Sequence, residues 1–121
     1  MYNILIVEDN KDNMAVMEAF LEDEFTLFCA GDGYEGLKIA KEVKPDLILM
    51  DISLPQMDGV EVLKKIRQTK DLQKIIVVAL TAHAMVGDKE KYLSEGFDAY
   101  MSKPIVDDEE LISMIYRLLE G

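Results

Sequence analysis

The chain has 121 residues, of which 24 are acidic and 13 are lysine or arginine, so its formal net charge is −11. This charge opposes binding to nucleic acid and to anionic membranes, and it favours basic partners or metal cations. No apolar run approaches the roughly 18 residues of a membrane span, and the N-terminus lacks a signal-peptide pattern. The single cysteine, Cys29, predicts a core thiol in a cytoplasmic protein.

Five apolar runs alternate with amphipathic segments. The runs cover residues 4–7, 25–30, 47–50 and 75–80, with a weaker one at 99–101, and their length predicts strands buried on both faces. Between the runs, apolar residues recur at helical spacing, as in Met14, Met17 and Leu21. Strand–helix alternation with short loops predicts an α/β fold, in which helices cover both faces of a parallel sheet. We expect residues 1–121 to form one such domain, with no output domain.

Two helix starts and one helix end are marked by local signals. Asp58 and Asp107 are expected to cap helices, since Glu61 and Glu110 follow them at the spacing of a capping box. Gly96 is expected to end the helix before the fifth strand.

Polar residues stand at the ends of four of the five runs. In a doubly wound parallel sheet, chemistry takes place beyond the carboxyl ends of the strands. The residues at these ends are Glu8, Asp9, Asp51, Thr81, Lys103 and Pro104. We therefore expect three carboxylates, a hydroxyl and an ammonium group to meet at one edge of the sheet.

The three carboxylates repel one another and require compensation. Two such charges about 4 Å apart cost about 4 kcal/mol at an effective dielectric constant near 20. Lys103 supplies one positive charge, and a hard cation such as Mg²⁺, which prefers oxygen ligands, supplies the rest. We expect Glu8 and Asp9 to bind the metal, together with Asp51 and a backbone carbonyl near Ser53.

Asp51 is the predicted nucleophile because it ends the central strand. A carboxylate can attack phosphorus to form an acyl phosphate. The transferred group carries charge on three oxygens, and we expect Mg²⁺, Lys103 and Thr81 to stabilise one oxygen each.

Four motifs in this order resemble the receiver domain of two-component response regulators over essentially the whole chain. They are Glu8-Asp9, "DISLPQMDG" at 51–59, "ALTAHA" at 79–84 and "YMSKP" at 100–104. The resemblance implies a flavodoxin-like, doubly wound sheet of five parallel strands in the order 2-1-3-4-5, flanked by five helices. It implies that Asp51 takes phosphate from a histidine kinase or histidine phosphotransfer protein. Such a domain turns over no external product and loses its own phosphate slowly.

The resemblance also implies how the signal leaves the site. Tyr100 would turn inwards when Thr81 moves towards the phosphoryl group, and the face formed by the fourth helix, fifth strand and fifth helix would then bind a downstream protein. The Lys103–Pro104 bond would be cis and would direct the ammonium inwards. The motif around residues 81–85 resembles receivers of hybrid kinases and stand-alone cell-cycle regulators.

Two further residues stand two positions beyond the predicted reactive groups. Ser53 and His83 are expected to border the site and to influence the attack of water on the acyl phosphate, although His83 fits an ordinary exposed loop equally well.

Three alternative functions fit the sequence less well. An aspartyl-phosphate phosphatase of the haloacid-dehalogenase type requires a second acid where this chain has Ser53. A flavodoxin-like nucleotide binder requires a phosphate-binding loop where Glu8 and Asp9 would repel phosphate. A receiver-like binding module that is not phosphorylated would not need the complete set of site residues.

Overall fold

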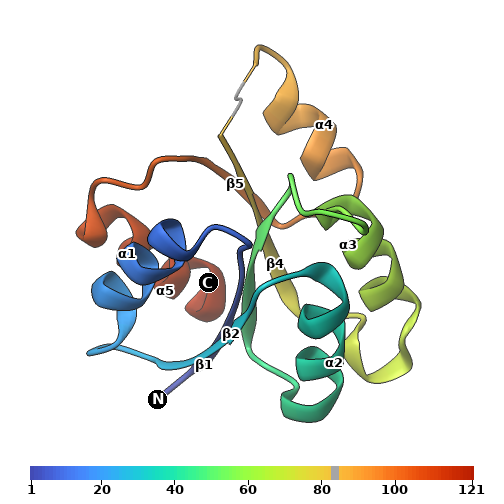
Figure 1. Ribbon diagram of the computed structural model, residues 1–121, viewed down its shortest axis with the longest axis horizontal. Helices are drawn as coiled ribbons and strands as arrows, with labels where there is room; N and C mark the ends of the chain where they lie inside the picture. The colour runs from blue at the N-terminus through green and yellow to red at the C-terminus, as the bar shows by residue number, and fades with distance from the viewer. Residues whose placement is uncertain (83–84) are drawn as a thin grey trace.

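The computed structural model describes residues 1–82 and 85–121. Five parallel strands form one sheet in the order β2-β1-β3-β4-β5, as predicted (Figure 1). The strands are β1 (Asn3–Val7), β2 (Thr26–Ala30), β3 (Leu47–Asp51), β4 (Ile76–Thr81) and β5 (Ala99–Ser102). The sequence predicted each strand to within one residue at either end.

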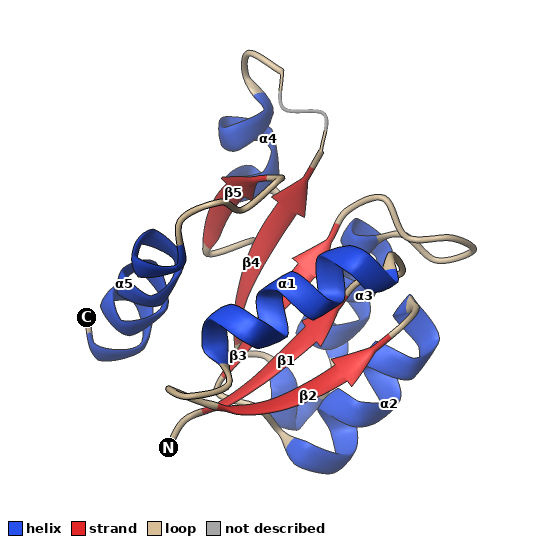
Figure 2. Cartoon of the chain, turned by 60° about the vertical axis from the view of Figure 1, so that its left-hand side comes forward, coloured by secondary structure: helices blue, strands red, loops and turns tan. Residues whose placement is uncertain are grey.

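Helices cover both faces of the sheet. In the described residues these are α1 (Lys11–Leu21), α2 (Gly33–Val43), α3 (Gly59–Gln68), α4 (Asp88–Ser94) and α5 (Asp108–Glu120). Helices α1 and α5 lie on one face, and α2, α3 and α4 lie on the other (Figures 1 and 2). A short 3₁₀ helix, η1 (Lys70–Leu72), precedes β4 and was not predicted.

The core consists of two layers separated by the sheet. In β1, Leu5 and Val7 pack under α2 and α3, whereas Ile4 and Ile6 pack under α1 and α5, and all four are fully buried. Since each such side chain contributes about 1.5–3 kcal/mol, strands that are apolar on both faces account for the continuous apolar runs.

The predicted helix signals are confirmed. The carboxylate of Asp58 accepts a hydrogen bond from the Glu61 N–H (2.9 Å), and that of Asp107 accepts one from the Glu110 N–H (3.2 Å). Gly96 has a φ of 113°, a conformation that favours glycine, just after α4. Cys29 is only partly buried; burial raises the pKa of its thiol to about 11, so the neutral form dominates near pH 7.

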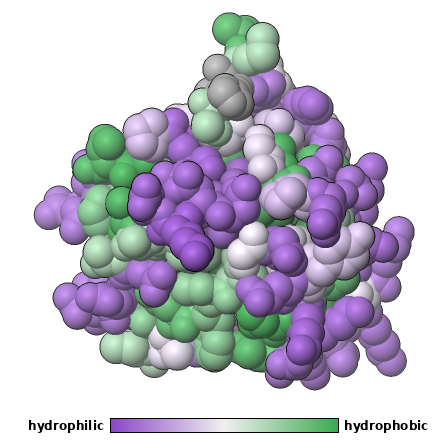
Figure 3. Space-filling model, in the orientation of Figure 1, coloured by the Kyte–Doolittle hydropathy of each residue, from purple (hydrophilic) through white to green (hydrophobic). Residues whose placement is uncertain are grey.

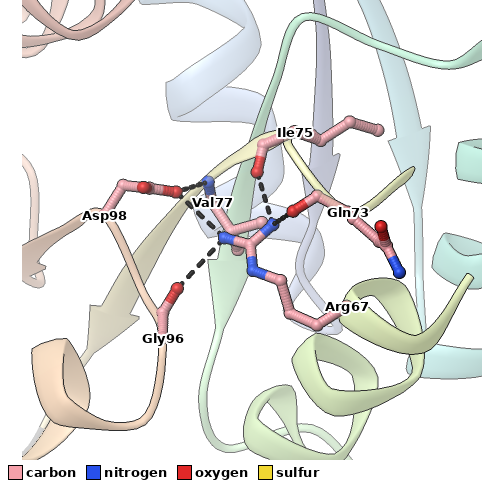
Figure 4. Close-up of polar contacts among 6 residues, drawn as sticks. All are labelled: Arg67, Gln73, Ile75, Val77, Gly96 and Asp98. Carbon is pink, nitrogen blue, oxygen red and sulfur yellow. Dashed lines mark hydrogen bonds and ion pairs between the residues drawn. The ribbon is translucent and has the colours of Figure 1, made fainter. Parts of the chain in front are cut away.

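Arg67, near the C-terminus of α3, connects the segments at the amino ends of β4 and β5 (Figure 4). Its guanidinium donates hydrogen bonds to the carbonyl oxygens of Gln73 (3.1 Å), Ile75 (2.7 Å) and Gly96 (3.0 Å), and to the Asp98 carboxylate (3.0 Å). These contacts, here named the Arg67 network, connect α3 with the segments that lead into β4 and β5. Sequence reasoning missed them.

Figure 3 shows hydrophilic residues over much of one face, with hydrophobic residues between them. None of the helices in the described part of the chain combines the length and the apolar character needed to cross a bilayer.

Candidate functional site

The predicted site residues meet at the carboxyl edge of the sheet. Asp51 and Thr81 are the last residues of β3 and β4, and Glu8 and Lys103 directly follow β1 and β5. Backbone hydrogen bonds extend the sheet here: the Glu8 N–H donates to the Ala30 carbonyl (3.0 Å) and the Lys103 N–H to the Thr81 carbonyl (2.7 Å). The fold therefore fixes the backbone from which each reactive side chain extends.

Three charged side chains are buried together at this edge. The Lys103 ammonium lies 2.8 Å from the Glu8 carboxylate and 3.2 Å from the Asp51 carboxylate. The side chains of Lys103, Glu8 and Asp51 are 9%, 0% and 3% exposed, respectively. One buried cation is thus shared between two buried anions.

The pKa values of two of these groups respond to the shared burial. Burial raises the pKa of Glu8 above its ordinary value, although the hydrogen bond from Lys103 opposes the shift. Burial alone would lower the pKa of Lys103, but its hydrogen bond to Glu8 and the charges of Asp51 and Glu8 together raise it. Lys103 is therefore held in its charged form by the carboxylates around it.

The third carboxylate, that of Asp9, completes a group suited to a metal ion. Glu8, Asp9 and Asp51 each place a carboxylate oxygen such that the three atoms lie within 4.8 Å of one another. Asp9 is exposed, whereas the other two are buried, so the group opens to solvent on one side. Carboxylate oxygens with an open, hydrated side are the donor set that Mg²⁺ prefers.

The loop after β3 holds the Asp51 carboxylate in place. The Ser53 N–H donates to this carboxylate (3.0 Å), and the Ile52 N–H donates to the Leu80 carbonyl (2.9 Å). Gly59, at the start of α3, approaches so closely that a Cβ atom there would lie 2.5 Å from the Asp51 carbonyl oxygen. The Ser53 backbone N–H thus contacts Asp51, while the expected roles of its side chain and carbonyl stay predictions. The glycine that ends the "DISLPQMDG" motif has a packing role.

The remaining predicted residues differ in how the structure places them. Thr81 is 3% exposed at the end of β4. Tyr100 is partly buried and packs against the core. The Lys103–Pro104 peptide bond is cis, as the resemblance implied. His83 lies outside the described residues, so its expected position beside the site stays a prediction.

Comparison with known proteins gives a consistent result. The family model for the response regulator receiver domain matches residues 4–116. The polar-differentiation response regulator DivK of Brucella anthropi is 43% identical over 104 residues, which cover 85% of each chain.

Solved structures of similar shape belong to the same class. The receiver domain of the sensor histidine kinase PA1611 from Pseudomonas aeruginosa, with a magnesium ion coordinated in its active site cleft, has a TM-score of 0.90 at 34% identity and covers 99% of this chain and 98% of its own. The chemotaxis protein CheY4 of Vibrio cholerae also has a TM-score of 0.90, at 26% identity, with 98% and 99% covered.

The fold and the acidic edge thus define a phosphoacceptor domain of two-component signalling. The chain belongs to the response regulator receiver domain family. Receiver domains bind Mg²⁺ at their acidic site, and the three carboxylates of this chain fit such an ion.

Proposed function

We propose that Asp51 is the phosphoacceptor and that Glu8, Asp9 and Asp51, with the backbone carbonyl of Ser53, hold the Mg²⁺ ion. The observation that carries the proposal is the burial of Asp51 against the Lys103 ammonium, within a group of three carboxylates. When bound, the metal would supply positive charge that lets a phosphoryl group approach these anions.

The transfer step forms one bond and breaks one. An Asp51 carboxylate oxygen attacks the phosphorus of a phosphohistidine, a P–O bond forms, the P–N bond breaks, and its electron pair returns to the imidazole nitrogen. Lys103 is positioned to stabilise one phosphoryl oxygen, because its ammonium already lies 3.2 Å from the Asp51 carboxylate. The Thr81 hydroxyl stabilises a second oxygen.

The signal would leave the site through Thr81 and Tyr100. In the register of β4 and β5, Thr81 pairs with Ser102 and Ala79 with Tyr100, so Thr81 and Tyr100 share one face of the sheet. Movement of Thr81 towards the phosphoryl group would allow the Tyr100 ring to turn inwards. A recess of about 650 Å³ lies between α4, β5 and α5, and its lining includes Lys89, Tyr100 and Arg117. The inward turn of Tyr100 would alter the shape of this recess, which would then contact a downstream protein.

The partners follow from this chemistry. The phosphodonor is a histidine kinase or histidine phosphotransfer protein. The domain does not turn over an external substrate, because the phosphoryl group stays on Asp51 until water slowly removes it. Ser53, and His83 if it borders the site, would influence that hydrolysis. A cytoplasmic location belongs to the same proposal, since one unpaired cysteine suits a reducing compartment.

Incubation with acetyl phosphate, with and without Mg²⁺, followed by intact mass spectrometry tests the proposal. We expect a gain of one phosphoryl group that requires Mg²⁺ and is absent in Asp51→Asn. Asp23→Asn is the matched control, because Asp23 is exposed in the turn between α1 and β2.

Two outcomes would contradict the proposal. One is an Asp51→Asn chain that gains the phosphoryl group as readily as the wild type. The other is a wild-type chain that gains none under conditions in which its fold, monitored by circular dichroism, is intact.

A further inference from the structure

The ring of Tyr100 rests on a second aromatic side chain, which the proposed function does not use. The rings of Tyr92 in α4 and Tyr100 in β5 are stacked, with their centroids 5.9 Å apart and an angle of 16° between their planes. Parallel, offset rings are a favourable arrangement for an aromatic pair. Helix α4 therefore has a direct contact with the ring that would carry the signal.

Tyr92 itself is held firmly. It is 8% exposed, and its ring packs edge-to-face on Phe97 at 6.0 Å and 90°. The Phe97 N–H donates to the Tyr92 carbonyl (3.2 Å), and the Lys91 ammonium lies 5.3 Å from the Tyr92 ring centroid. A ring fixed on several sides can act as a support for a neighbour that moves.

In the stacked arrangement, part of the Tyr100 side chain reaches solvent, as an outward ring would. Tyr100 is partly exposed and lines the recess between α4 and α5. A Tyr100 ring turned inwards would leave the lining of this recess and would lose its contact with Tyr92. Tyr100 pairs with Ala79 in β4, and the side chain of Ala79 is small. In the described residues, the aromatic ring that contacts Tyr100 is therefore that of Tyr92.

We infer that Tyr92 is a positioning residue, which holds Tyr100 outward through the ring stack and thereby sets how readily the phosphoryl switch operates. This inference rests on the proposed function, because it needs the inward movement of Tyr100. An aromatic pair stabilises a structure beyond the effect of simple burial. Its loss should shift the equilibrium between outward and inward Tyr100 by a factor of about two to about ten.

The test measures the affinity of the site for beryllium fluoride, a stand-in for the phosphoryl group, in the presence of Mg²⁺. If the fluoride complex favours the inward arrangement, its apparent affinity rises with the fraction of molecules already in that arrangement. We expect Tyr92→Leu to bind the complex between about twofold and about tenfold more tightly than the wild type. Tyr92→Phe, which keeps the ring, should bind as the wild type does. Bound fluoride is followed by ¹⁹F NMR.

Two further variants separate the stack from a general loosening of α4. Tyr92→Met fills the space with a flexible side chain and should behave like Tyr92→Leu, which keeps the test valid if Tyr92→Leu folds poorly. In a Tyr100→Leu background, replacing Tyr92 by leucine should have no further effect, because the stack is already lost.

The outcomes distinguish this inference from the proposed function. Equal affinity in the wild type, Tyr92→Leu and Tyr92→Met would overturn the inference alone. Tighter binding that persists in the Tyr100→Leu background would also overturn it, because the effect would not pass through Tyr100. A folded wild type that does not bind beryllium fluoride would overturn the proposed function and this inference with it.

Discussion

Two cationic side chains, Arg67 and Lys103, lie at opposite ends of the sheet and differ in how well their charge is balanced. Arg67 donates to three carbonyl oxygens and to one carboxylate, that of Asp98. Lys103 is shared by the buried carboxylates of Glu8 and Asp51, with Asp9 close by. The Arg67 network pairs one cation with one carboxylate, whereas the site around Lys103 carries excess negative charge.

The chemistry of arginine and lysine side chains suits the different surroundings of Arg67 and Lys103. A guanidinium presents five donors in a rigid planar fork, whereas an ammonium is a compact charge on a flexible stem. Asp98 also accepts a hydrogen bond from the Val77 N–H (2.8 Å), so the partner of Arg67 is itself fixed. The Arg67 network thus connects the segments that lead into β4 and β5, whereas the excess negative charge around Lys103 suits a metal ion.

The largest expected effect comes from removing the cation at the site with excess negative charge. Lys103→Met leaves Glu8 and Asp51 buried without their shared partner, and we expect a loss of about 3 kcal/mol in the free energy of unfolding without Mg²⁺. Saturating Mg²⁺ should restore part of it. Urea unfolding measures both values, with Lys74→Met, at an exposed position, as the control. A loss that is identical with and without the metal would contradict the comparison.

Removing the cation of the Arg67 network should cost somewhat less. Arg67→Ala leaves several carbonyl groups without their donor, and we expect a loss of about 2 kcal/mol, with the half-exposed Asp98 contributing little of it. The loss in Arg67→Lys should be smaller than in Arg67→Ala but not zero, because an ammonium cannot reproduce the planar fork of a guanidinium. The loss should be the same with and without Mg²⁺ in urea unfolding, and a clear dependence on the metal would show that the two ends are not independent.

A smaller effect is expected from the metal itself. At a Mg²⁺ concentration ten times its dissociation constant, the wild type should gain about 1.4 kcal/mol in the free energy of unfolding. Asp9→Asn should weaken this gain, since it removes one of the three clustered carboxylates. Thermal unfolding over a Mg²⁺ series measures the gain, and Asp23→Asn serves as the control. An unchanged gain in Asp9→Asn would exclude Asp9 as a ligand.

The smallest effect concerns the carboxylate in the Arg67 network. Asp98→Asn retains an acceptor for the Val77 N–H and loses only the charge, and the Asp98 side chain is 41% exposed. We expect a loss below about 1 kcal/mol, which salt should reduce further. Asp98→Ala should cost more, because it also removes the acceptor. Equal losses in the two variants would mean that the hydrogen bond to Val77 contributes nothing.

The two ends also differ in how well the sequence predicts them. Lys103 and Glu8 are 95 residues apart in the chain, yet their proximity was predicted, because both stand at the ends of parallel strands. Arg67 and Asp98 are only 31 residues apart, and their contact was missed. Arg67 lies in the last turn of α3 and Asp98 in a loop, so no repeating pattern relates their positions.

The local structure shows the same division. The strands and the caps Asp58 and Asp107 were predicted because apolar runs and capping residues act over a few neighbouring positions. The 3₁₀ helix at Lys70–Leu72 has too few residues to show a period. The stacking of Tyr92 on Tyr100 depends on where α4 crosses β5, which the sequence pattern does not specify.

The most direct test of the account is to identify the phosphorylated carboxylate. The chain is treated with acetyl phosphate and Mg²⁺, the acyl phosphate is reduced with borohydride, and the product is mapped by peptide mass spectrometry. Reduction converts a phosphorylated aspartate to homoserine, and we predict homoserine at position 51 alone. Homoserine at position 9, or at any other aspartate in place of Asp51, would contradict the assignment of Asp51 as the reactive carboxylate beside Lys103.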